Sequence, residues 1–248
     1  MPNIHSSISF GLVNIPIIMN PIIRNNDTSF NQLHTKCQER ISYVKYCPHC
    51  KVNLKEKDII KGYEYEDNKY ITFSKEELNK LKPEQEKEID IVSFVPMSEV
   101  DPMYFEKSYI LETEGKGKAY NLFCEALKKS KLVAVAKTVI GTKFYYCILR
   151  FFEAKIIMTT LYFEEEIFIS NSTSKANIDE EELNMAIKLI DNLKGKFEPE
   201  KYKDEYQDNI KKAIDDKIDG KKITKSKKKS KKQITDLMVA LEKSLKKK

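Results

Sequence analysis

The chain of 248 residues lacks tryptophan and has only seven glycines and three histidines. So few glycines argue against a glycine-rich phosphate loop or a dinucleotide-binding unit. The histidines, His5, His34 and His49, form no pattern with serine and aspartate that is typical of a hydrolase triad. Runs of acidic residues at 164–166 and 180–182 are typical of solvated surfaces. The sequence therefore predicts a protein without catalytic activity and without a catalytic cofactor.

Long apolar runs are also missing. The most apolar N-terminal stretch, residues 10–23, is interrupted by Asn14, Pro16, Asn20 and Pro21 and has no basic residue before it, so it is typical of a strand and not of a signal peptide. Five cysteines, an odd number, do not favour a secreted disulfide framework. We expect a cytoplasmic protein.

Arginine is scarce, since Arg24, Arg40 and Arg150 are the only three. Lysine suits contact with phosphates better than the bidentate reading of bases, although a lysine bias of the genome would leave the same composition. Residues 221–248 hold twelve lysines and two acidic residues, so the rest of the chain is slightly acidic despite a formal net charge of +6. This tail is expected to be disordered when free and to bind DNA electrostatically.

Residues 1–175 have mostly strand-like patterns. Apolar, β-branched and aromatic runs recur about every ten residues, which favours a meander or barrel; they fall at 8–10, 13–19, 70–73, 89–95, 104–111, 132–140, 143–152, 155–163 and 166–169. Two short helices are predicted within this region, one from Ser74 to before Pro83 and one over 118–129. The fold class is mixed α+β.

Residues 176–220 change to helical patterns. A helix should run from Asp179 to Leu193, and Pro199 should open a second one that ends at Gly220. Beyond the lysine run a last amphipathic helix is predicted, with apolar residues at Ile234, Leu237, Met238, Leu241 and Leu245. This helix is too short to be stable alone, so it should bind a groove, and we favour a groove in a partner over one in its own chain.

The sharpest local motif pairs His34 with Cys37 and Cys47 with Cys50. Zinc prefers four sulfur and nitrogen ligands delivered as two close pairs, and a closed set of four would be structural. Two alternatives remain open: a CxxC thiol oxidoreductase that uses a reactive thiolate, or ordinary reduced cysteines. Cys124 and Cys147 lie in apolar patterns and are expected in the core.

Several strings, in order along nearly the whole chain, resemble bacterial Ku proteins, which act in non-homologous end joining. They are residues 7–16 (SISFGLVNIP), Leu33-His34 with Cys37 and the Cys47-Pro48-x-Cys50 that follows, residues 61–66 (KGYEYE), Val92-x-Phe94-Val95-Pro96 with Asp101-Pro102-x-Tyr104-Phe105, and Asp236-Leu237-Met238-x-Ala240-Leu241. The resemblance implies a β-barrel core with a bridge arm over 1–175, a zinc-ribbon-like segment at about 33–62, a helical C-terminal arm over 176–220 and a basic tail over 221–248. It implies a homodimeric ring around ends of double-stranded DNA in the bacterial cytoplasm, associated with the nucleoid.

The resemblance further implies an ATP-dependent DNA ligase as partner, which we assign to Leu237, Met238, Leu241 and Leu245. The residues expected to face DNA are basic: Lys36, Arg40, Lys45, Lys137, Lys143, Arg150, Lys221, Lys222, Lys225, Lys227, Lys228, Lys229, Lys231 and Lys232. His5, Ser6, Ile18 and Gly141 depart from the family pattern, which shifts part of the expected DNA binding to the tail. A zinc-containing scaffold that binds nucleic acid only through this tail is the main alternative.

Overall fold

The structure, a computed structural model, describes residues 4–81, 88–113, 117–170 and 178–222. The chain forms two compact units, Met1–Asn25 with Asn31–Ile169, and Asn26–Phe30 with Ser170–Lys248. The predicted lysine run from 225 onward and the predicted terminal helix lie outside the described residues.

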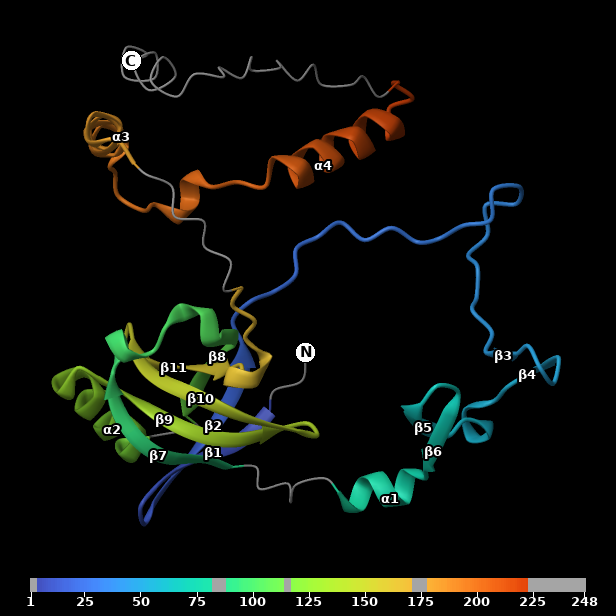
Figure 1. Cartoon of the computed structure of the whole chain (residues 1–248), viewed down its shortest axis with the longest axis horizontal. Coiled ribbons are helices and arrows are strands. Elements are labelled where there is room, and N and C mark those ends of the chain that lie inside the picture. The colour runs from blue at the N-terminus through green and yellow to red at the C-terminus, as the bar shows by residue number, and fades with distance from the viewer. Residues whose placement is uncertain (1–3, 82–87, 114–116, 171–177, 223–248) are drawn as a thin grey trace. The chain divides into compact units, whose positions relative to one another are not determined.

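Within the described part of the first unit, seven strands close into a barrel in the order β1-β2-β8-β11-β10-β9-β7 (Figure 1). These strands are β1 (Ile4–Phe10), β2 (Val13–Pro21), β7 (Glu88–Pro96), β8 (Phe105–Thr113), β9 (Leu132–Ile140), β10 (Lys143–Phe152) and β11 (Lys155–Leu161). Neighbouring strands are antiparallel except β1 and β7, which pair in parallel at Ser7 with Glu88, Ile8 with Ile89 and Ser9 with Asp90. The predicted barrel in an α+β fold is thus confirmed.

The barrel core follows from alternation along the strands, since every second residue of a strand faces the interior. The inward residues are small or branched and apolar, and they include Ile8, Ile17, Met19, Ile89, Leu111, Ala134, Ala136, Cys147, Leu149, Ile156 and Met158. Cys147 is buried as expected, and burial raises the pKa of its thiol to about 12.

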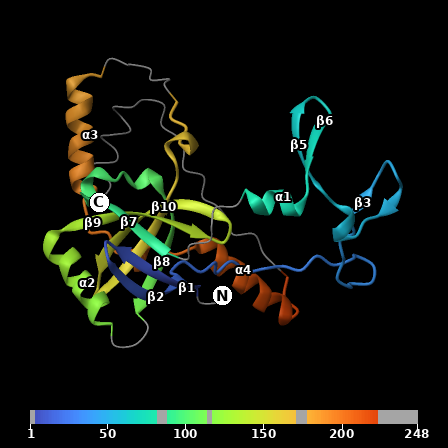
Figure 2. The same cartoon turned by 90° about the horizontal axis from the view of Figure 1, so that it is seen from below.

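Helix α2 (Lys118–Ser130) covers one end of the barrel (Figures 1 and 2). It adds Tyr120, Phe123, Cys124 and Leu127 to the core. The Tyr120 hydroxyl accepts a hydrogen bond from the Ile156 amide (3.0 Å) and donates one to the Leu111 carbonyl. Burial raises the pKa of Tyr120 to about 12. Tyr120 therefore ties α2 to the backbones of β8 and β11.

The opposite end of the barrel, here called the open end, is where the chain leaves and re-enters. β2 runs to Pro21, which pairs with Tyr109 on β8, away from the α2 end. β7 begins at Glu88, whose register partner is Ser7 on β1. Since β2 and β7 both pair with β1, residues 22–87 are an excursion whose two ends lie one strand apart.

Residues 31–81 of this excursion, here called the arm, contain short elements. These are β3 (Tyr46–Cys47) with β4 (Val52–Asn53), β5 (Lys61–Glu66) with β6 (Lys69–Phe73), and α1 (Lys75–Lys80). Helix α1 begins as predicted, with Ser74 and Glu77 forming a capping box. None of the arm's residues is buried. The arm therefore has no hydrophobic core of its own.

The second unit contains α3 (Glu180–Leu193) and α4 (Glu205–Ile218). Asp179 caps α3 as the sequence predicts. Pro199, however, opens only a 3₁₀ turn, Pro199–Lys201, and α4 starts at Asp204, whose carboxylate accepts from the amides of Tyr206 and Gln207. The predicted single helix from Pro199 is wrong because Asp204 supplies a better N-cap.

One predicted strand is also wrong, because residues 166–169 form no strand. Glu164–Glu166 adopt a 3₁₀ turn, and Glu166 accepts a side-chain bond from the Phe163 amide (2.9 Å). A run of acidic residues that caps a turn competes with strand pairing. Among the described helices, none combines the length and the apolarity that crossing a membrane would need.

Tyr120→Phe should lower the free energy of unfolding by about 1–3 kcal/mol, because two buried backbone groups lose their partner. Urea unfolding followed by circular dichroism measures this. Tyr63→Phe, at a residue 66% exposed, is the control and should change stability by less than about 0.5 kcal/mol. Equal stability of the two variants would contradict the role given to Tyr120.

Candidate nucleic-acid interface

The first pair of predicted zinc ligands, His34 and Cys37, lies on a tight turn of the arm. The Gln38 amide donates to the His34 carbonyl (2.7 Å), and Gln38 has a positive φ of 60°. His34 Nδ1 and Cys37 Sγ lie 3.0 Å apart. An isolated antiparallel bridge between Leu33 and Arg40 closes the turn. The sequence spacing of three thus places an imidazole and a thiol side by side.

The second pair repeats this turn between β3 and β4. The Lys51 amide donates to the Cys47 carbonyl (2.8 Å), and Lys51 has a φ of 55°. The Cys50 amide donates to Cys47 Sγ (3.4 Å). In both turns, a residue with positive φ therefore follows the second candidate zinc ligand. The backbone amide of that residue donates a hydrogen bond to the carbonyl of the first candidate ligand.

The two thiols of the second turn differ in acidity. Hydrogen bonds from the backbone and side chain of Cys50 lower the pKa of Cys47, whereas the bond shared with Cys47 raises the pKa of Cys50. Cys47 is thus the favoured thiolate, the form that binds metals and attacks disulfides. The turn joins two strands, however, and does not open a helix, whose N-terminus is a common means of activating such a thiolate.

The donor chemistry of the two turns fits zinc, with three thiols and one imidazole in two close pairs. The structure gathers each pair but not the four donors. Across the described residues, no three His, Cys, Asp or Glu side chains come together closely enough to hold a metal ion. Zinc binding at His34, Cys37, Cys47 and Cys50 stays a prediction.

The predicted basic residues of the arm lie at the surface. Lys36 and Arg40 are exposed. Lys45 forms an ion pair with Glu56, which lowers the pKa of that carboxyl. Residues 31–61 hold seven basic residues and three acidic ones. The part of the arm that carries both turns is therefore positively charged.

Two predicted barrel lysines lie toward the open end. Lys137 on β9 pairs in register with Tyr146 and forms an ion pair with Asp90 (3.1 Å). Lys143 starts β10, with its ammonium 3.7 Å from Glu166 and 5.1 Å from the centre of the Tyr145 ring. Each lysine is about half exposed.

Strand alternation separates these lysines by face. Cys147 points inward, so Tyr145 and Lys143 share the inward side of β10, and Tyr146 with its partner Lys137 lies outward. Arg150, also predicted, faces outward but is four residues further along β10, toward α2, with its guanidinium 5.3 Å from the Phe152 ring centre. The structure does not bring Arg150 to the open end.

The sequence pattern alone missed Lys107. This residue of β8 lies close enough to Tyr145 and Tyr109 to interact electrostatically, and the Glu106 carboxylate beside it raises its pKa. Lys107 and Lys143 thus both flank Tyr145 at the open end. β8 and β10 are separated by β11 in the barrel, so only strand order could have revealed this group.

An aromatic cluster on the outward side was missed as well. The Tyr146 ring contacts Phe144 (centroids 5.3 Å apart) and Phe163 (6.2 Å), both edge to face. Tyr146 is 40% exposed and pairs in register with Lys137. The alternating aromatics at 144 and 146 were the available signal. Of the tail, Lys221 and Lys222 are described and exposed, and Lys221 pairs with Asp219 (3.0 Å).

Known proteins match this barrel. The Ku family model, described as the Ku70/Ku80 beta-barrel domain, matches residues 9–185. Three relatives are each named non-homologous end joining protein Ku. The protein of Lachnoclostridium phytofermentans is 41% identical over 98% of this chain and 95% of its own, that of Desulfitobacterium hafniense 38% over 96% and 85%, and that of Bacillus subtilis 40% over 80% and 66%. This chain belongs to the Ku family.

Proposed function

We propose that this chain binds ends of double-stranded DNA as a homodimeric ring, independently of sequence and without catalysis, in non-homologous end joining. The match of the Ku model to residues 9–185, which include six complete strands of the closed barrel and the end of β1, carries the proposal. The process, non-homologous end joining, is taken from the names of the relatives.

The arm supports the ring geometry. The excursion over 22–87 that contains it leaves and re-enters at one end of the barrel, one strand apart, and none of the arm's residues is buried. A segment without a core gains little from packing on itself. The exposed surface of the arm is available to another molecule, while the excursion begins and ends in barrel strands.

The charge distribution supports a phosphate partner. Basic residues gather in 31–61 and in the tail, while the chain outside the tail is slightly acidic overall. Lys107, Lys137 and Lys143 lie at the open end of the barrel, each beside a carboxylate that a phosphate could replace. Lysines contact phosphates without a fixed geometry, which suits a protein that reads no sequence.

Two finer assignments complete the proposal. Leu237, Met238, Leu241 and Leu245 bind an ATP-dependent DNA ligase through an amphipathic helix; the sequence pattern supports this assignment, and these residues lie outside the described part of the chain. His34, Cys37, Cys47 and Cys50 hold one structural zinc ion, and the repeated turn geometry supports that assignment. Zinc would fix the arm in place of a hydrophobic core.

Competition binding at near-physiological salt tests the ring. Full-length protein should prefer a blunt linear duplex over a covalently closed circle of the same sequence, because only an end admits a ring. A full-length variant with Lys225, Lys227, Lys228, Lys229, Lys231 and Lys232 changed to glutamine should keep this preference. Its dependence of log K on log salt should weaken by about 0.9 for each phosphate that the variant no longer neutralises.

Equal competition by circles, or complete loss of binding in the glutamine variant, would instead support a scaffold that binds through its tail.

Elemental analysis of the purified full-length protein tests the metal. We expect about one zinc per chain, with loss of zinc in His34→Ala and in Cys47→Ser. His49→Ala is the matched control, because His49 lies in the second turn but outside the predicted ligand set. A wild-type protein without zinc would refute the site. Loss of zinc in His49→Ala but not in His34→Ala would show that His49, and not His34, is the imidazole ligand.

Ligation assays test the terminal helix. Leu237→Asp should abolish stimulation of the ligase while DNA binding stays unchanged, since a carboxylate on the apolar stripe blocks its burial. Thr235→Asp adds the same charge off the stripe and should retain stimulation. Unchanged stimulation by Leu237→Asp would rule out recruitment through this segment.

A further inference from the structure

Residues Asn26–Phe30 belong to the second unit, although they lie between β2 and the arm in the sequence. The chain therefore leaves the barrel after Pro21, enters the unit of α3 and α4 for five residues, and then begins the arm. Residues 26–30, here called the first root of the arm, are thus held in the unit of α3 and α4, whereas the chain after the arm continues into β7. The contact that holds residues 26–30 decides how firmly the first root is fixed.

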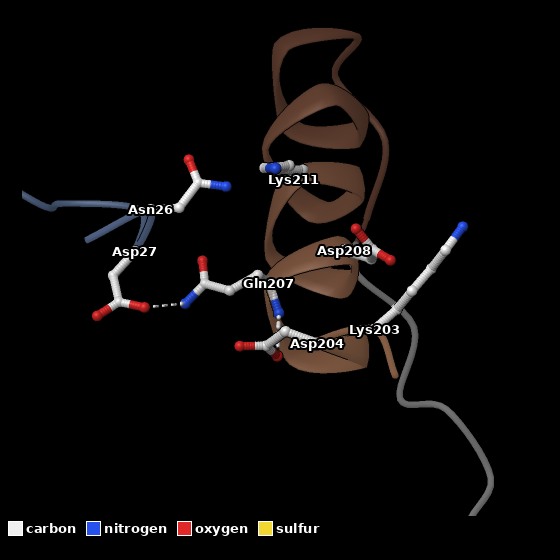
Figure 3. Close-up of a pocket in the computed structure, with 7 residues that line it drawn as sticks. All are labelled: Asn26, Asp27, Lys203, Asp204, Gln207, Asp208 and Lys211. Carbon is white, nitrogen blue, oxygen red and sulfur yellow. Dashed lines mark hydrogen bonds between the residues drawn. The ribbon is translucent and has the colours of Figure 1, made fainter. Parts of the chain in front are cut away.

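Gln207 of α4 bonds to two neighbouring residues of this segment. The Thr28 amide donates to Gln207 Oε1 (3.0 Å), and Gln207 Nε2 donates to Asp27 Oδ1 (3.4 Å). Figure 3 shows the Gln207 amide directed at Asp27 across the pocket. Both functions of the amide, acceptor and donor, are therefore used on adjacent residues of the same segment.

Gln207 is well placed for this role by the start of α4. Its backbone amide donates to the Asp204 carboxylate (3.0 Å), which fixes it in the first turn of the helix. Gln207 and Thr28 are both half-buried, whereas Asp27 is exposed. A pocket of about 270 Å³ surrounds this contact, and every lining residue is of a polar or charged type: Asn26, Asp27, Lys203, Asp204, Gln207, Asp208 and Lys211.

The polar lining determines what kind of contact this is. Among the described residues that line the pocket, none has an apolar side chain, and the contacts that Gln207 makes with the segment are directional hydrogen bonds. Such a contact depends on having a donor and an acceptor in the right order. It can also open and reclose at little cost, because water replaces the bonds that open.

We propose that Gln207 is a positioning residue that clamps the first root of the arm to α4 and thereby holds the arm closed around bound DNA. The role of the clamp on DNA rests on the proposed function; the clamp itself does not. Once the clamp opens, residues 26–30 lose the two bonds that Gln207 makes with them. The nearest barrel contact of that root is then the bond from the Ile22 amide to the Ser108 carbonyl (3.1 Å).

The chemistry of the clamp allows an exchange of donor and acceptor. Gln207→Glu keeps an acceptor for Thr28 but sets a second carboxylate against Asp27. Adding Asp27→Asn restores the match, because the new amide donates to the new carboxylate. Asn209→Asp places the same added charge on an exposed position of α4 and is the matched control.

Hydrogen exchange of the full-length protein without DNA tests the clamp. The Thr28 amide should exchange about fivefold faster in Gln207→Glu, as expected for loss of one or two hydrogen bonds, and at the wild-type rate in the double variant and in Asn209→Asp. Unchanged exchange in Gln207→Glu, or no recovery in the double variant, would overturn the clamp.

Retention on DNA tests the positioning role. Protein is loaded onto a linear duplex, both ends are then blocked with streptavidin, and dissociation is followed in raised salt. The dissociation rate of Gln207→Glu should be about fivefold higher than that of the wild type, since changes at an interface act mostly on the off-rate. The double variant should dissociate at the wild-type rate. If the wild type is retained and Gln207→Glu is retained equally long, the positioning role is overturned. Escape of the wild type itself would refute the ring and leave the clamp to be judged by exchange.

Discussion

Hydrogen bonds between β1 and β7 join the first strand to the strand that resumes the barrel at Glu88. This parallel pairing removes the exposed sheet edges that β1 and β7 would otherwise present. It also sets the two ends of the excursion over 22–87 one strand apart, at the end that α2 does not cover. A long exposed arm is compatible with a stable barrel because the excursion that contains it begins and ends at hydrogen-bonded strands.

The arm obtains its local order without burial. Its two donor turns are set by backbone bonds, from Gln38 to His34 and from Lys51 to Cys47, each with one residue of positive φ. Small units without a core usually depend on a metal or a disulfide. On the proposed function, zinc would take the place of a core at these turns, whose thiols lie outside any packed interior.

Much of the fold could be predicted from local signals. The strands at 132–140 and 143–152 and the caps at Ser74 and Asp179 are determined by neighbouring residues, and the structure has them. The start of α4 was missed because Asp204 competes with Pro199 as a helix start. Lys107 was missed because its neighbour Tyr145 is reached only across β11, and no local pattern encodes strand order. The donor pairs, at a spacing of three, were visible in the sequence; their repeated turn geometry was not.

The three lysines described at the open end of the barrel already have carboxylate partners: Asp90 for Lys137, Glu166 for Lys143 and Glu106 for Lys107. The pairs of Lys137 and Lys143 are exposed on both sides, and such pairs are weak and screened by salt, so a phosphate can replace the carboxylate at small cost. The displaced carboxylate then stands beside the DNA and repels it. Such a surface binds DNA less tightly than unpaired lysines would. On the proposed function this is an advantage, because a ring is retained by its topology, and weak, rapidly exchanged contacts let it move along the duplex.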